Sequence, residues 1–170
     1  MKVPTRSIVL AGSIIVLAGC SDSTSPPSGP LAPSQTRQWA PEGSHFNLEI
    51  VLRGDGSGHV KFRQPKDDAF IINLDTRVRD LEPNTAYVLQ RAVDTNLDGI
   101  CSSTAWLTLG KGLVPQTITT DEKGRGEENL FRDVAAAGAG ATFDIAFRVV
   151  NVATSAVVLT SDCYRYTVRQ

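Results

Sequence analysis

The segment VDTNLDGICSSTAW contains the side chains of this chain best suited to chemistry. Asp94, Asn96 and Asp98 alternate along it, and Gly99 follows directly. In calcium-binding loops, oxygen ligands at the first, third and fifth positions converge on an ion about 2.5 Å away, and a glycine at the sixth position makes the turn. The first half of the segment therefore matches a calcium loop.

The second half of the segment departs from that pattern. The twelfth position is Ala105, where a calcium loop carries a bidentate glutamate. A complete site would need a carboxylate from elsewhere, for example Asp121, Glu122 or Asp162. In the alternative interpretation, Asp and Asn side chains cap their own turn and Gly99 supplies a positive φ. We expect the capped turn and no cofactor, with a structural calcium ion at Asp94, Asn96 and Asp98 as the alternative.

Catalytic arrangements are hard to find in the rest of the chain. The two histidines, His45 and His59, fall on different strands of an expected hairpin, too far apart to share an ion. Ser57 lies in GDGSG, but a hydrolase elbow needs glycine two residues before and after the serine, and Asp55 and His59 occupy these positions. We expect no enzyme; a small calcium- or metal-dependent hydrolase using residues 94–98 is the alternative.

The N-terminus has the features of a secretory signal. Lys2 and Arg6 precede an apolar run from Ile8 to Val16, which is far shorter than the roughly 20 residues of a membrane-spanning helix. The following LAGC resembles the bacterial lipoprotein box, which implies lipidation of Cys20 after removal of residues 1–19. Ordinary cleavage is the alternative. Attached acyl chains contribute about 0.8 kcal/mol per buried CH₂, so Cys20 would be a membrane anchor.

Residues 20–44 form the expected tether, and residues 45–170 the folded domain. The stretch SDSTSPPSGPLAPSQT consists mostly of Ser, Thr, Pro and Gly, and such a composition buries too little apolar surface to offset the entropy of ordering. Ser21 after the lipidated cysteine favours export to the outer membrane or cell surface, with the periplasm as the alternative. The predicted localisation is the bacterial cell envelope.

Two cysteines, Cys101 and Cys163, remain for the folded domain. In an oxidising compartment two such thiols usually pair. Neither has a CxxC partner or a neighbouring histidine, so a metal-binding or catalytic thiol is disfavoured. The sequence predicts a Cys101–Cys163 disulfide that holds a loop against the last strand.

Alternation with a period of two dominates the domain. In HFNLEIVLR the apolar residues Phe46, Leu48, Ile50 and Leu52 share one face, as a half-buried strand requires. Similar patterns follow in HVKF, AFIINLDTRVRDL, TAYVLQRAV, TFDIAFRVV and the C-terminal CYRYTV, separated by frequent turns. We expect an all-β domain, an antiparallel immunoglobulin-like sandwich of eight or nine strands.

The net charge of the mature chain and its even distribution argue against nucleic acid as a partner. Without Lys2 and Arg6, 15 basic side chains face 18 acidic ones, a net charge of about −3 with no block of one sign. Nucleic acid is therefore not an expected partner, and membrane contact is expected only through the lipid anchor. A binding or structural module for an envelope protein or glycan is the expected role. Candidate contact residues are the aromatic side chains Tyr87, Trp106, Tyr164 and Tyr166, although a core position is the other interpretation for each.

Three turn motifs, GSGHVKF, LEPNTAYVLQ and TTDEKGRG, occur here in an order that resembles the chordin-type repeat domain and similar immunoglobulin-like modules of secreted bacterial proteins. The family's His-x-His after the tyrosine strand is missing, because this chain reads QRAVDTNLDG there, so no metal role is carried over. The chain is also similar to uncharacterised bacterial lipoproteins with DGIC, WLTLG and SDCYRY around paired cysteines. The resemblance implies the fold and the disulfide and leaves the function open.

Overall fold

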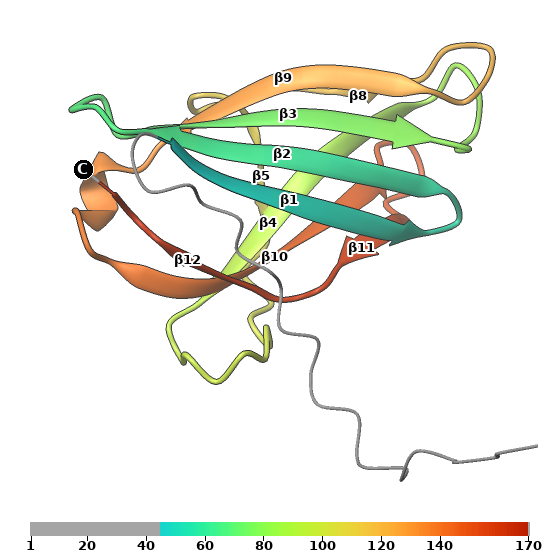
Figure 1. Ribbon diagram of the computed structural model, residues 1–170. Coiled ribbons are helices and arrows are strands. Elements are labelled where there is room, and N and C mark those ends of the chain that lie inside the picture. Colours follow the sequence, from blue (N-terminus) through green and yellow to red (C-terminus); the bar gives the residue numbers. More distant parts are fainter. Residues whose placement is uncertain (1–44, 170) are drawn as a thin grey trace, which may run out of the picture. The chain divides into compact units, whose positions relative to one another are not determined.

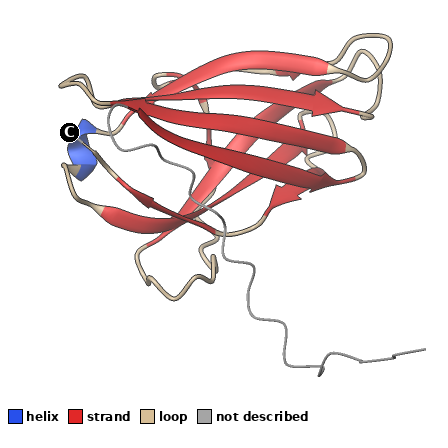
Figure 2. Cartoon of the chain, viewed as in Figure 1, coloured by secondary structure: helices blue, strands red, loops and turns tan. Residues whose placement is uncertain are grey.

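The computed structural model describes residues 45–169 and shows an all-β domain. The expected signal (residues 1–19), the lipidation site Cys20 and the tether up to residue 44 lie outside the described residues. Among the described residues, no helix is long and apolar enough to cross a membrane. The all-β prediction is confirmed, and Figure 2 shows strands throughout with one short helical turn.

The described residues form twelve strands, more than the expected eight or nine, and eight of them have four residues or more. These eight are β1 (His45–Gly54), β2 (Ser57–Pro65), β3 (Ile71–Arg79), β4 (Ala86–Asp94), β9 (Gly126–Asp133), β10 (Thr142–Asn151), β11 (Val157–Ser161) and β12 (Tyr164–Thr167). Four further strands have two residues each: β5 (Leu107–Thr108), β6 (Gly110–Lys111), β7 (Val114–Pro115) and β8 (Ile118–Thr119). The 3₁₀ helix η1 (Ala135–Ala137) lies in the small-residue segment before β10.

Alternation along the strands determines which side chains enter the core. On β3, Ile72, Leu74, Thr76 and Val78 are buried, and their intervening neighbours are more exposed. Directly paired residues of antiparallel strands point to the same face, so the partners of these residues on β2 and β9 also point inward. The period of two in the sequence thus corresponds to a real inner and outer face.

The strands form one continuous sheet, not the two separate sheets of the expected sandwich. The order is β5-β4-β10-β11-β1-β2-β3-β9-β6-β7, with β12 paired to β10 and β8 paired to β4. Figure 1 shows this sheet curled, so that β4 and β10 cross beneath β1, β2 and β3. Phe62 on β2 accordingly contacts Phe147 on β10 and Tyr166 on β12, with ring centroids 6.4 and 4.7 Å apart.

A short segment joins the two edges of the curled sheet. β5 pairs with β4 at Gln90 and Arg91, and three residues later β6 pairs with β9 at Phe131. Between them, the Leu109 amide donates to the carbonyl oxygen of Leu89 at 2.8 Å, and the Leu109 side chain is buried. The sheet is therefore nearly barrel-shaped, closed over part of its length by residues 107–111.

The alternating residues of the first hairpin, folded about Gly56, predict His59 opposite Arg53, but the observed register is shifted by two residues. Arg53 pairs with Ser57, and His59 lies opposite Val51. The cause is the third neighbour, β11: the Asp55 amide donates to the Val158 carbonyl oxygen at 3.0 Å, which fixes where the turn begins. His45 lies opposite Pro65, so the two histidines remain apart along the strands.

The disulfide is present between Cys101 and Cys163, whose Cα atoms are 5.5 Å apart. Cys163 lies in the connection between β11 and β12, directly before β12 and not within a strand. Cys101 lies in the long loop after β4, as expected. The bridge attaches this loop to the C-terminal part of the domain.

Two of the turn motifs quoted above pack against each other. The Tyr87 hydroxyl accepts a hydrogen bond from the Glu82 amide at 3.2 Å, and the Thr120 hydroxyl donates to the Glu82 carbonyl oxygen at 2.6 Å. Asp121 caps its own turn by accepting from the amides of Lys123 and Arg125 at 2.8 and 2.9 Å. The motifs LEPNTAY and TTDEKGRG thus stabilise one end of the sheet together.

Candidate functional site

The acidic loop has the hydrogen bonds of a capped turn. Asp94 Oδ1 accepts from the Asn96 amide at 3.0 Å, and its Oδ2 accepts from the Ser102 hydroxyl at 2.8 Å. Asp98 accepts from the Ile100 amide at 2.8 Å and, through its other oxygen, from the Asn96 side-chain amide at 2.6 Å. These bonds, led by the one from the Asn96 amide, hold the pKa of Asp94 below its ordinary value. Gly99 has the expected positive φ, 80°.

Calcium binding at Asp94, Asn96 and Asp98 stays a prediction. Within residues 45–169 no three His, Cys, Asp or Glu side chains converge as metal ligands. Two of the additional carboxylates considered above have other contacts: Asp121 pairs with Arg125 at 3.1 Å, and Asp162 pairs with Arg53 at 3.1 Å. Among the described residues neither joins Asp94 and Asp98 in a metal-binding group, although Asp162 directly precedes Cys163, which is bonded to the loop at Cys101.

An ion pair between the buried Asp144 and the half-exposed Arg165, which the sequence analysis missed, supports the acidic loop. Asp144 on β10 is fully buried and accepts from Arg165 Nε at 2.9 Å and from the Gly99 amide at 2.7 Å. Hydrogen bonds from Arg165 are the main reason why the pKa of Asp144 lies below its ordinary value. Asp144 and Arg165 are direct partners in the β10–β12 pairing. The acidic loop is therefore anchored on the sheet as a structural element.

The aromatic candidates divide into core and surface. Tyr87, Tyr164 and Tyr166 are buried in the core, so the core interpretation holds for all three. Trp106 is partly exposed, and the Arg148 guanidinium lies 4.1 Å from the centroid of its ring. Of the four, only Trp106 is positioned for contact with a partner on the outer surface.

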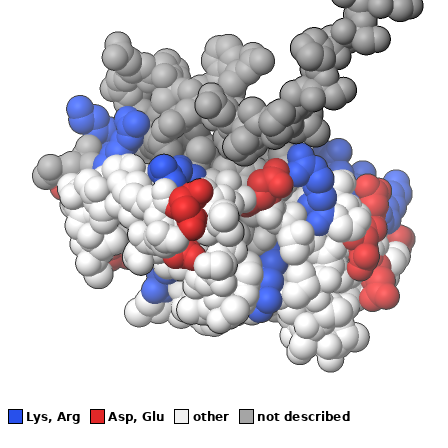
Figure 3. Space-filling model, turned by 90° about the horizontal axis from the view of Figure 1, so that it is seen from below, with Lys and Arg blue, Asp and Glu red and all other residues white. Residues whose placement is uncertain are grey.

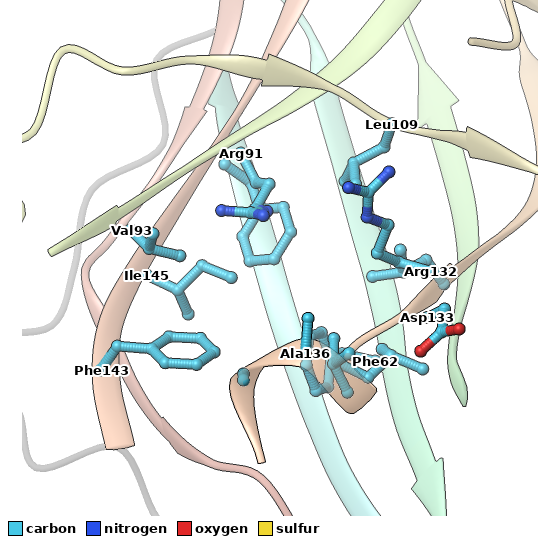
Figure 4. A pocket seen from close by; sticks show the side chains of 14 residues that line it. Phe62, Arg91, Val93, Leu109, Arg132, Asp133, Ala136, Phe143 and Ile145 are labelled. Carbon is cyan, nitrogen blue, oxygen red and sulfur yellow. The ribbon is translucent and has the colours of Figure 1, made fainter. Parts of the chain in front are cut away.

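A cavity of about 360 Å³ lies inside the curled sheet (Figure 4). Ligand-binding cavities generally lie between roughly 300 and 1,000 Å³. Apolar side chains supply most of its lining. They come from the four strands β2, β3, β4 and β10, from residues 107–111, and from the segment that follows β9: Phe62, Ile72, Leu74, Val93, Leu109, Val134, Ala136, Ala137, Phe143, Ile145 and Phe147. The remaining lining residues are Arg91, Arg132 and Asp133.

The cavity exists because the closure of the sheet is incomplete. Residues 107–111, which join the two edges, pair with β4 only as far as Arg91 and with β9 only at Phe131. Past these pairs, no strand pairing among the described residues joins the two edges. Val93 on β4 and Val134 after β9 therefore border open space, and η1 lies across it.

Arg91 and Arg132 occupy inward-facing positions on their strands. Arg91 pairs directly with Phe147, and Arg132 with Ile72, and both of these partners belong to the buried core. In Figure 4 the Arg132 guanidinium lies near Leu109 and the Arg91 guanidinium lies across from it, on the side of Val93 and Ile145, while Phe143 and Ala136 lie at the other end. The two positive groups thus lie toward one end of the cavity, and Asp133 lies nearer the other.

The two arginines interact unfavourably with each other. The pKa of Arg91 lies below its ordinary value, first because burial disfavours the charged form and second because Arg132 is close. Among residues 45–169 neither forms an ion pair with a carboxylate; Arg132 donates to the Gly112 carbonyl oxygen at 3.1 Å. Asp133 lines the same cavity and accepts from the Ala135 amide at 2.8 Å.

The sequence analysis did not select these arginines, although a signal was present. In AYVLQRAV, Arg91 follows Tyr87 and Leu89 at spacing two, and in ENLFRD, Arg132 follows Leu130 at the same spacing. A charged residue in the apolar register of a half-buried strand departs from the expected pattern. Such a departure is a reason to look for a binding site.

The face of the outer surface drawn in Figure 3 carries charges of both signs. On the face in Figure 3, Lys and Arg side chains are interspersed with Asp and Glu side chains. Several form exposed ion pairs, such as Arg77 with Glu127 at 2.9 Å. Exposed pairs of this kind contribute little to stability. The inward-facing arginines are therefore distinguished from the other arginines by their position.

Comparisons with known proteins do not place the chain in a family. No family model matches it, and a search of curated proteins found no match.

Proposed function

We propose that this protein is a lipid-anchored binding module of the bacterial cell envelope, without enzymatic activity, that holds a small apolar ligand inside its curled sheet. The observation that carries the proposal is the cavity between β4 and β9, with its predominantly apolar lining. Contact with apolar side chains removes ligand surface from water, which contributes about 25 cal/mol per Å². A ligand that fills the cavity would gain affinity mainly in this way.

The composition of the cavity supports binding over turnover. Proton transfer requires groups that exchange protons near the working pH, and most of the lining side chains are hydrocarbon. Arg91 and Arg132 remain charged at that pH, because arginine has a very high pKa. Asp133 uses one carboxylate oxygen to cap the start of η1. This set of residues is suited to holding a molecule.

The anchor belongs to the same proposal. The LAGC motif and the Ser- and Pro-rich tether support lipidation at Cys20 and display of the domain away from the lipid surface. A flexible tether of 24 residues has a root-mean-square reach of roughly 27 Å. Incorporation of an alkyne-labelled fatty acid into the wild type, but not into Cys20→Ala, would support the anchor. Label retained in Cys20→Ala would contradict it.

An immunoglobulin-like, chordin-type sandwich is the finer fold assignment within this proposal. Its support is the packing of LEPNTAY against TTDEKGRG, together with the facing halves of the curled sheet. The binding proposal does not depend on this assignment.

A neutral fluorescent probe tests the binding proposal. N-phenyl-1-naphthylamine becomes fluorescent in apolar surroundings, so we expect saturable binding to the full-length protein. Val93→Phe, which adds volume to the cavity lining, should abolish the signal. The matched variant Val51→Phe adds the same volume on an exposed position of β1 and should bind normally. Equal binding by both variants, or no binding by the wild type, would contradict a ligand in this cavity.

A further inference from the structure

We propose that the ligand is an amphipathic monocarboxylate, with its apolar body among the hydrocarbon side chains of the cavity and its carboxylate between Arg91 and Arg132. This inference deepens the proposed function and rests on it. It commits to a chemical class, a fatty-acid-like molecule with one negative charge.

The first step is the position of the arginines. Strand pairing places Arg91 and Arg132 beside buried partners, Phe147 and Ile72, on the inner face of the sheet. Bringing a charged group toward an apolar interior is costly unless an opposite charge or hydrogen-bond acceptors compensate. Two such residues on one cavity indicate a function for the charges, since leucine or valine would pack there at lower cost.

The second step is the hydrogen-bonding capacity that remains. A guanidinium carries five N–H donors in a planar fork that matches the two oxygens of a carboxylate. Arg132 uses one nitrogen on the Gly112 carbonyl oxygen, which fixes its side chain against the hairpin of β6 and β7. Within the described part of the chain, the Arg91 guanidinium forms no hydrogen bond or ion pair, and burial and the neighbouring Arg132 are the causes of its lowered pKa. An anion between the two groups would satisfy donors on both.

The third step is the charge. Arg91 and Arg132 contribute two positive charges to the cavity lining, and Asp133 contributes one negative charge, which leaves a single positive charge. One carboxylate neutralises this excess, whereas a phosphate dianion would overcompensate. The same carboxylate would offset both causes of the lowered pKa of Arg91, which are first its burial and second the repulsion from Arg132.

The fourth step is the shape of the lining. The two guanidinium groups lie on opposite sides of one end of the cavity, that of Arg132 near Leu109, and Phe143 and Ala136 lie at the opposite end (Figure 4). A ligand with a charged head and a hydrocarbon body matches this polarity in a single orientation. Neither a sugar nor a peptide with distributed polar groups does so, because its polar atoms would face Phe143 and Ile145 without partners.

Calorimetry on the full chain with three ligands of equal length tests the inference. Decanoate carries the carboxylate, decanamide replaces it with a neutral polar head, and decylammonium reverses its charge. The protein carries Cys20→Ser, so that no attached acyl chain competes for the cavity. We expect decanoate to bind about tenfold to a hundredfold more tightly than decanamide, as hydrogen bonds to charged groups generally provide. Decylammonium should bind least.

Two variants separate failure of the inference from failure of the proposed function. Arg91→Leu replaces the charged group by an apolar side chain that suits an inward-facing position, and should lose the preference for decanoate while still binding decanamide. Arg79→Gln removes an exposed arginine on the outer face of β3 and should leave all three affinities unchanged. Equal affinity for decanoate and decanamide in the parent protein would overturn the carboxylate site and leave the apolar cavity intact. Absence of binding by all three ligands would overturn both proposals.

Discussion

Arg165 on β12 donates two hydrogen bonds to Asp144 on β10, from Nε at 2.9 Å and from a terminal nitrogen at 3.2 Å. The carboxylate is buried, whereas half of the arginine side chain is exposed. Asp144 also accepts from the Gly99 amide, so one side chain joins the C-terminal strand, the sheet and the acidic loop. This contact predicts how the stability of the domain depends on pH.

The folded domain should lose stability in acid because of Asp144. Its pKa is lower in the folded state than in the unfolded chain, where aspartate has a pKa of about 3.9. The charged carboxylate therefore stabilises the fold above that pH, and the contribution is lost as the pH falls through the folded-state value. In urea denaturation from pH 7 downward, Asp144→Asn should be less stable than the wild type at neutral pH, with a difference that shrinks below about pH 4.

Asp162→Asn is the matched control for this pH dependence. Asp162 also pairs with an arginine, Arg53 at 3.1 Å, but both side chains are well exposed. Solvent screens such a pair, so the variant should follow the wild-type profile. A difference between Asp144→Asn and the wild type that stays constant down to pH 2.5 would contradict the assignment.

The disulfide should contribute strongly to stability. Cys101 and Cys163 are 62 residues apart in the sequence. A cross-link over a loop of this length lowers the entropy of the unfolded chain, which stabilises the folded state by about 4 kcal/mol. The double variant Cys101→Ser with Cys163→Ser should lose about this amount in chemical denaturation. Reduction of the wild type should cause a similar loss. Free thiols detected by alkylation of the unreduced protein would show that the bond is absent.

Replacing Gly124 by alanine should also lower the stability of the domain strongly, because the space around this glycine is crowded. Gly124 has a φ of 69°, and a Cβ atom there would lie 2.1 Å from the carbonyl oxygen of Leu81. Gly99 has a similar φ of 80°, but nothing lies within 4 Å of its Cβ position. Gly99→Ala should therefore cost only the conformational penalty, about 1–2 kcal/mol, whereas Gly124→Ala adds a steric clash to it. Equal midpoints of thermal unfolding for the two variants would contradict the packing of these turns.

Much of the fold could be predicted from local patterns. Alternation identifies the long strands, because each strand has one buried face, and export to an oxidising compartment predicts the pairing of Cys101 with Cys163. Gly99 could be expected at a positive φ because it follows two turn-forming residues. The strands and the turn depend on residues close in the sequence, and the disulfide depends on the presence of only two cysteines in the domain.

The closure of the sheet could not be predicted in the same way. Residues 107–111 contact β4 and β9 in strands of only two residues, which are too short to show a periodic pattern. The buried Asp144 looked like an ordinary outward-facing residue of β10, because its partner Arg165 lies 21 residues away on another strand. The cavity depends on how the sheet closes and on the register of its strands. The placement of Arg91 and Arg132 on one cavity is therefore visible only in the folded structure.

The acidic loop should keep its conformation without calcium. Both carboxylate oxygens of Asp94 and of Asp98 accept hydrogen bonds from their own loop, and Asp144 accepts the Gly99 amide beneath it. An ion at Asp94, Asn96 and Asp98 would have to replace several of these bonds, and the expected position for a bidentate glutamate holds Ala105. We therefore expect no shift in melting temperature at millimolar calcium, and no heat in calorimetry. Saturable heat that disappears in Asp98→Ala would instead establish the calcium site that the spacing suggests.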